Sequence, residues 1–215
     1  MAFSIGIVGF PNVGKSTLFQ TLTKKQVDCS NYAFCTIDPN IGIVAVPDKR
    51  VEKLAEIIET KKKTYPTVEF VDIAGLVEGA NKGDGLGNKF LANIRETDVI
   101  VFVLRAFSKS GVVNVRQEIN PLKESELLNT ELALKDLETI EKRLLGLEKE
   151  VRARKKEAIF ASEVFSKAKK LLEEGISLAE FSLDEEEKKV LSECQLLTLK
   201  PRIYLLNGKK TEVSP

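Results

Sequence analysis

The segment from Gly9 to Ser16 holds the residue types, at the right spacing, for binding phosphate. It reads Gly-Phe-Pro-Asn-Val-Gly-Lys-Ser and fits the pattern G-x-x-x-x-G-K-[ST]. Its glycines let the backbone curl so that N–H groups point at phosphate oxygens, with a helix N-terminus behind them. Lys15 would reach the terminal phosphates, and the Ser16 hydroxyl would ligate Mg²⁺. The predicted nucleotide-binding residues of this loop are Gly9, Asn12, Val13, Gly14, Lys15, Ser16 and Thr17.

A second group of residues has the chemistry to hold the metal and sense the last phosphate. Asp72-Ile-Ala-Gly75 follows a strand-like segment; Asp72 would hold Mg²⁺ through water, and the Gly75 N–H would contact the terminal phosphate. Thr36 lies in a loop where a nucleotide switch supplies a second metal-binding hydroxyl, but a solvent-facing threonine explains the spacing equally well. The glycines that follow, up to Gly87, predict a mobile stretch.

Two positions depart from the usual GTPase pattern. Where Asn-Lys-x-Asp would read guanine, the chain has Asn207-Gly-Lys-Lys210. A lysine ammonium cannot accept the guanine N–H groups, so guanine selection by that route is not expected, and Asn207 would fix the loop or belong to an ordinary Asn-Gly turn. Leu76 stands where many GTPases have the glutamine that orients water, which predicts slow turnover and leaves the catalytic group unidentified.

The elements that must position these residues alternate between strand and helix. Such alternation predicts an α/β fold with a mostly parallel sheet covered by helices. The expected strands cover residues 3–9, 41–46, 67–72, 99–104 and 202–206, and the expected helices follow the phosphate loop, over 14–24, and the capping residue Asp48.

A helical region interrupts this pattern. Leu137, Ile140, Leu144, Leu147 and Val151 repeat at intervals of three and four residues, which is typical of a coiled-coil seam. Further helices are expected up to Gly175 and over 184–194. We therefore expect a P-loop core of residues 1–120 and 200–215, with 121–199 as an inserted antiparallel helical hairpin.

Composition and charge exclude several classes. The chain has 215 residues, 43% hydrophobic and 30% charged, which excludes a disordered chain. With 33 basic and 32 acidic side chains, its net charge does not argue for nucleic acid or a membrane. With no histidine, zinc sites of the Cys/His kind and His-based catalysis are excluded. We expect no signal peptide, membrane span or DNA binding, and a cytoplasmic location. Residues 142–170 hold ten basic and four acidic side chains, either a solvated helix face or a site for ribosomal RNA.

Taken together, the motifs resemble the YchF, or Obg-like ATPase, family. The resemblance rests on the phosphate loop and on the segments 31–40, 72–79, 83–91, 105–107 and 129–134. It implies a P-loop NTPase of the translation-factor class that binds ATP at least as well as GTP and associates with ribosomes. It also implies that Thr36 is a Mg²⁺ ligand and that Phe107, Asn207 and Gly208 line the base pocket. The family pattern has glutamate at the place of Lys210, and it continues past Pro215 with a last core strand and a ubiquitin-like domain.

The sequence therefore predicts a Mg²⁺-dependent nucleoside triphosphate hydrolase that prefers ATP and acts as a ribosome-bound switch. Two alternatives stay open: a GTPase with an atypical base-reading loop, and an RNA- or protein-binding module that nucleotide merely stabilises. A potassium ion is a further candidate cofactor, which Asn12 would help coordinate. The alternative is that the Asn12 side chain only braces the loop backbone.

Overall fold

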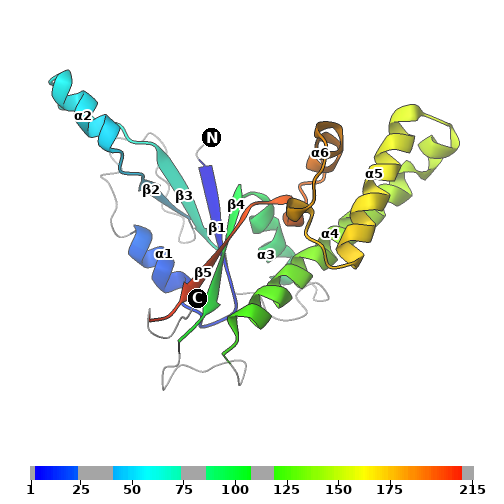
Figure 1. Cartoon of the computed structure of the whole chain (residues 1–215), viewed down its shortest axis with the longest axis horizontal. Coiled ribbons are helices and arrows are strands. Elements are labelled where there is room, and N and C mark those ends of the chain that lie inside the picture. Colours follow the sequence, from blue (N-terminus) through cyan, green and yellow to red (C-terminus); the bar gives the residue numbers. More distant parts are fainter. Residues whose placement is uncertain (1–2, 24–40, 74–85, 108–118, 210–215) are drawn as a thin grey trace.

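A five-stranded sheet forms the centre of the molecule (Figure 1). The computed structural model describes residues 3–23, 41–73, 86–107 and 119–209, with the side chains of 86–90 left aside. The strands are β1 (Phe3–Val8), β2 (Ile41–Ala45), β3 (Thr67–Asp72), β4 (Val99–Arg105) and β5 (Arg202–Asn207).

The sheet has the order β2-β3-β1-β4-β5. β1 pairs in parallel with β3 and β4, and β4 pairs in parallel with β5, whereas β2 runs antiparallel to β3. Every residue of β4 is buried, as expected for a strand with neighbours on both sides and helices over its faces. The parallel strands therefore bring the carboxyl ends of β1, β3, β4 and β5 to one edge of the sheet.

Helices cover the sheet and extend away from it. They are α1 (Lys15–Thr23), α2 (Lys49–Ile57), α3 (Leu86–Arg95), α4 (Pro121–Arg152), α5 (Lys156–Glu173) and α6 (Glu185–Ser192), with short 3₁₀ turns η2 (Leu178–Glu180) and η3 (Leu197–Leu199). Local sequence explains their starts: the Asp48 side chain accepts from the Arg50 N–H at α2, and Asn120 caps α4 ahead of Pro121. α1 lies on one side of the sheet, and α3 with the start of α4 on the other (Figure 1).

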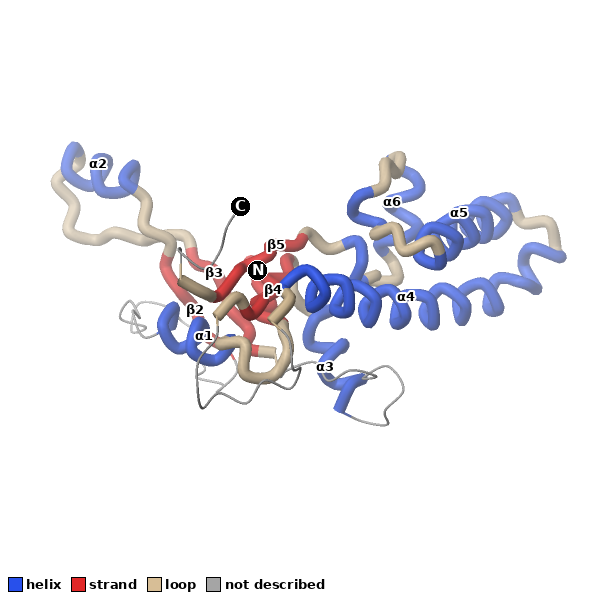
Figure 2. The backbone as a smooth tube through the Cα atoms, turned by 60° about the horizontal axis from the view of Figure 1, so that its bottom comes forward, coloured by secondary structure: helices blue, strands red, loops and turns tan. Residues whose placement is uncertain are grey.

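The long helix α4 takes part in two apolar cores. Leu128 and Leu132, near its beginning, pack with the sheet residues Ile7 and Phe102. Ile140, further along, packs with α5, α6 and the turns between them. α4 and α5 run side by side in opposite directions and project from the sheet, at the end of the molecule opposite α2 (Figure 2). The division at residues 120 and 200 stays a prediction.

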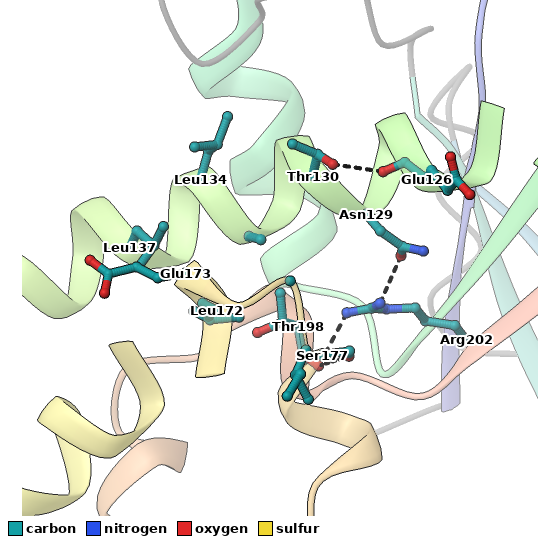
Figure 3. Close-up of a pocket in the computed structure, with 13 residues that line it drawn as sticks. Glu126, Asn129, Thr130, Leu134, Leu137, Leu172, Glu173, Ser177, Thr198 and Arg202 are labelled. Carbon is teal, nitrogen blue, oxygen red and sulfur yellow. Dashed lines mark hydrogen bonds between the residues drawn. The ribbon is translucent and has the colours of Figure 1, made fainter. Parts of the chain in front are cut away.

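Buried polar contacts join this hairpin to β5. The Asp136 carboxylate of α4 accepts hydrogen bonds from the backbone N–H groups of Leu197 and Thr198, at 2.9 and 2.7 Å, and from the Thr198 hydroxyl at 2.7 Å. Arg202 donates to Asn129 Oδ1 and to the Thr198 carbonyl beside a cavity of about 440 Å³ (Figure 3). These contacts fix the start of β5 against the hairpin.

The described structure differs from the sequence-based expectation in one helix. The glycines from Gly79 to Gly87 predicted a mobile stretch, of which residues 79–85 lie outside the described residues; Gly87 belongs to α3, which begins at Leu86 and buries Leu91 and Ile94 in the core. Tertiary burial of these two side chains outweighs the low helix propensity of glycine. None of the helices within the described ranges is long and apolar enough to cross a bilayer.

Candidate functional site

The predicted phosphate loop lies between β1 and α1. A Cβ added to Gly9 would lie 2.5 Å from the Val103 carbonyl oxygen, and Gly14 has a φ of +103°. Asn12 also adopts a left-handed backbone, with φ 64°, a conformation that asparagine tolerates better than most residues. Gly9 is therefore required by the close approach of Val103, and Gly14 by its left-handed backbone conformation. Together they allow the tight turn that leads into α1.

Lys15 is buried at the start of α1. Its ammonium donates to the Phe10 carbonyl oxygen at 2.9 Å, so the side chain folds back along the loop. Burial lowers the pKa of Lys15, and the nearby Asp72 carboxylate partly opposes this change. The ammonium is thus held in a partly dehydrated position, where an added phosphate would improve its environment.

Asn207, at the end of β5, contacts the same loop. Its side-chain amide donates to the Val13 carbonyl oxygen at 2.8 Å, and a Cβ on Gly14 would lie 2.3 Å from the amide nitrogen. The next residue, Gly208, has no room for a side chain, because its Cβ would lie 2.4 Å from the Ala106 carbonyl oxygen. The end of β5 is therefore fitted closely against both the phosphate loop and the segment after β4.

Phe107 follows β4 and is held by Arg105. The guanidinium lies 4.7 Å from the centre of the Phe107 ring, and Arg105 Nε donates to the Phe107 carbonyl oxygen at 3.1 Å. The Arg105 backbone N–H donates to the Glu124 carboxylate at 3.1 Å. Arg105 and Glu124 are both buried. The sequence analysis assigned a role to neither residue. Two features could have pointed to them: Arg105 is a charged residue at the end of an apolar strand, and Glu124 is an acid in the first turn of α4.

These elements surround one open cavity of about 510 Å³. The side chains and backbone that line it come from the phosphate loop, the start of α1, the segment after β4 and the end of β5. They are Asn12, Gly14, Lys15, Ser16, Thr17, Phe107 and Asn207. The structure therefore brings together most of the predicted nucleotide-binding residues, although Phe107 and Asn207 lie far from the loop in sequence. Three predicted residues do not line the cavity: Val13 is buried, and Gly9 and Gly208 pack closely against the backbone of Val103 and Ala106.

Two of the three predicted metal ligands are described. Ser16 lines the cavity, and Asp72 ends β3 close enough to influence the charge of Lys15. A hydroxyl and a carboxylate are hard oxygen donors, and Mg²⁺ is usually bound by one or two such groups together with phosphate oxygens and water. The donor set therefore fits Mg²⁺. Thr36, Gly75, Leu76 and Lys210 lie outside the described residues.

The fold and the cavity define a P-loop nucleotide-binding protein with the GTPase fold. A family model described as "50S ribosome-binding GTPase" matches residues 4–149, more than half of the chain. The chain belongs to this family, and within it to the YchF group that its motifs resemble.

The similar proteins carry the YchF name. "Ribosome-binding ATPase YchF" of Bacillus subtilis is 46% identical over the whole chain, and that of Haemophilus influenzae is 49% identical over 96% of it. The solved "Structure of the Schizosaccharomyces pombe YchF GTPase" matches 98% of the chain with a TM-score of 0.80 and 36% identity. The chain spans 57–58% of the length of these proteins.

Proposed function

We propose that the chain is a Mg²⁺-dependent nucleoside triphosphate hydrolase that prefers ATP and acts as a slow switch on the ribosome in the cytoplasm. The proposal rests foremost on the cavity where the phosphate loop meets Phe107 and Asn207. A cavity at the carboxyl ends of parallel strands, beside a helix N-terminus, suits a nucleotide with its phosphates on the loop. We further propose that residues 1–120 and 200–215 are the nucleotide-binding core and 121–199 the inserted hairpin.

The roles of the loop residues follow from their chemistry. Lys15 exchanges its contact with the Phe10 carbonyl for the β- and γ-phosphates, which offer full negative charge. Ser16 and Asp72 hold Mg²⁺, Asp72 through water, and Thr36 supplies a second hydroxyl. When bound, the metal neutralises charge on the terminal phosphates. The Gly75 N–H contacts the γ-phosphate, and Leu76 leaves the attacking water without the usual glutamine, which makes turnover slow.

The preference for ATP rests on the end of β5. Phe107 and Asn207 line the cavity together with the phosphate loop, and an aromatic ring beside a side-chain amide suits a planar base. Lys210, in the place of the residue that accepts guanine N–H groups, offers no acceptor. The competing proposal of a GTPase fails if ATP binds at least as well as GTP. Titration of both nucleotides with Mg²⁺ tests this, and GTP binding about tenfold tighter, or 1.4 kcal/mol, overturns the preference.

Hydrolysis and ribosome binding need separate measurements. Turnover of ATP above that of a Lys15→Ala control separates a hydrolase from a module that nucleotide only stabilises. Two observations support ribosome binding. The relatives are named as ribosome-binding ATPases, and a basic loop connects α4 and α5 at the far end of the hairpin (Figure 1). The four cations at this turn are Arg152 at the end of α4, Arg154 and Lys155 in the loop, and Lys156 at the start of α5. Reversing all four is expected to weaken co-sedimentation with ribosomes and to make it less dependent on salt. Binding that ignores salt and the reversals favours a merely solvated helix face.

A further inference from the structure

A groove between α3 and α4 gathers basic side chains away from the nucleotide cavity. Its volume is about 560 Å³. The lining residues are Leu91, Ala92 and Arg95 of α3 and Lys135, Glu138, Thr139, Lys142 and Arg143 of α4. On α4 these positions recur at intervals of three and four residues, so they share one face of the helix. Four cations thus face one carboxylate across two helices.

The charges of the groove are only partly compensated. Lys135 pairs with Glu138 at 2.6 Å, which accounts for the single carboxylate among the lining residues. Lys142 and Arg143 are exposed, and among the described residues neither makes an ion pair. The groove therefore presents the uncompensated positive charge of Lys142 and Arg143 to a ligand, beside Arg95, which also lies near the Asp136 carboxyl.

Arg95 is held in place and retains a donor. Its Nη2 donates to the Thr139 hydroxyl at 2.8 Å, which joins α3 to α4. Its Nε is buried and has no hydrogen-bond partner in the described part of the chain. Buried donors nearly always have a partner, so this one is unusual. The guanidinium that carries it lines the groove, where an anion would pair with the charge of the whole group. Lys200 donates hydrogen bonds to the carbonyls of Arg95 and Thr97, which fixes the C-terminal end of α3.

We infer that this groove binds phosphate groups of an RNA backbone, an inference that rests on the ribosome association proposed above. Its volume of about 560 Å³ is larger than one phosphate fills, and its cations continue along α4. Lys149 lies seven residues after Lys142, on the same face and about 10 Å further along the helix axis. Cations spaced along a helix match a polyanion better than a single small anion. The RNA contact therefore extends from the hairpin to α3, the helix that follows the 74–85 segment.

The test is RNA binding by the 215-residue protein with a charge-reversal pair in the groove. A fluorescein-labelled RNA hairpin is titrated by anisotropy with the wild type and with Lys142→Glu/Arg143→Glu, both saturated with Mg²⁺ and a non-hydrolysable nucleotide. We expect the pair to weaken binding at least about tenfold. The slope of log K against log salt is expected to become shallower by about 0.9 for each duplex phosphate that the variant leaves without a cation. Arg95→Gln is expected to weaken binding as well, and urea unfolding checks that it is folded.

The matched control reverses two exposed lysines at the opposite end of the molecule. Lys61→Glu/Lys62→Glu changes the net charge equally, in the segment after α2. It is expected to change RNA affinity less than about twofold, because the Debye length is only about 10 Å at 0.1 M salt. An equal reduction of affinity in both pairs would show a long-range effect of net charge and overturn the groove as the site.

Further measurements distinguish RNA phosphates from free phosphate, and a failure of the groove proposal from a failure of the proposed function. Inorganic phosphate or pyrophosphate that binds the wild type but not the groove pair, with RNA affinity the same in both, overturns RNA as the ligand. Wild-type ribosome binding that the basic-loop reversals reduce and the groove pair leaves unchanged overturns the groove and keeps the proposed function. A wild type that binds neither ribosomes nor RNA overturns both, while ATP turnover still reports on the nucleotide site.

Discussion

The Asn207 side chain donates to the Val13 carbonyl oxygen at 2.8 Å, across 194 residues of sequence. This bond ties the end of β5 to the phosphate loop, next to Gly14, whose left-handed backbone favours glycine. The shape of the loop therefore depends on a strand that the chain adds last among those described. The contact between Asn207 and Gly14 also gives a direct way to test the geometry.

Asn207→Ala is expected to lower the free energy of unfolding by about 1 kcal/mol, the usual net value of one hydrogen bond. Gly14→Ala is expected to cost more, since its φ is left-handed and its new methyl meets the Asn207 amide. Because Asn207→Ala removes that amide, the double variant is expected to be more stable than the sum of the two single effects predicts. Urea denaturation measures the cycle, and effects that add within about 0.5 kcal/mol contradict the contact.

Lys15→Ala is expected to weaken Mg²⁺-nucleotide binding by at least about 100-fold, or 2.7 kcal/mol, since it removes the cation for the terminal phosphates. In the absence of nucleotide, stability is expected to change by less than about 1 kcal/mol, because removing a dehydrated ammonium offsets the missing bond to Phe10. Calorimetric titration and urea unfolding measure the two effects, with the exposed Lys53→Ala as control. Unchanged affinity would refute the loop's assignment.

Asn12 is predicted to help hold a potassium ion that bridges the phosphates, in place of an arginine that stabilises the transition state. ATP hydrolysis is then faster in K⁺ than in Na⁺ at equal ionic strength. Asn12→Ala removes the difference while nucleotide stays bound. Equal rates of the wild type in the two salts contradict this role and leave Asn12 as a residue that only shapes the loop.

Asp136→Asn tests the buried junction between the hairpin and β5. Burial raises the pKa of the Asp136 carboxyl above its ordinary value, against the opposing effects of its hydrogen bonds with Thr198 and Leu197 and of nearby Arg95. The folded protein therefore binds this proton more tightly than the unfolded chain. That contribution to stability is complete below pH 3.8, the ordinary pKa, and is lost as pH rises through the raised value.

Asn cannot titrate, so the unfolding free energy of the wild type minus that of Asp136→Asn is expected to fall as pH rises from about 4. The variant itself is expected to lose about 1–3 kcal/mol at acidic pH, because its amide nitrogen cannot accept the bonds that the carboxyl accepts. Urea unfolding across pH measures the difference, in which the other carboxyl groups cancel. A pH-independent difference contradicts the raised pKa.

The sequence predicted the strands well, because local patterns determine them, and the nucleotide-binding role of the phosphate loop stays a prediction. β1 and α1 flank a loop whose glycines and lysine have fixed spacing, and β4 is apolar throughout. The antiparallel direction of β2 was not foreseen, since alternation of side chains is the same in either direction. The bond between Asn207 and Val13, and the packing of Arg105 on Phe107, were equally out of reach. They depend on the order of strands in the sheet rather than on neighbours in sequence.

Because β4 is completely buried between β1 and β5, we expect it to be the part of the sheet that opens last. We expect its amide protons to exchange with solvent deuterium only when the whole sheet unfolds, so that their exchange rate measures the global stability. A nucleotide that binds only the folded protein slows that exchange by the factor 1 + [L]/Kd. The amide exchange rate of β4, a strand that does not line the cavity, thus reports the affinity of the nucleotide.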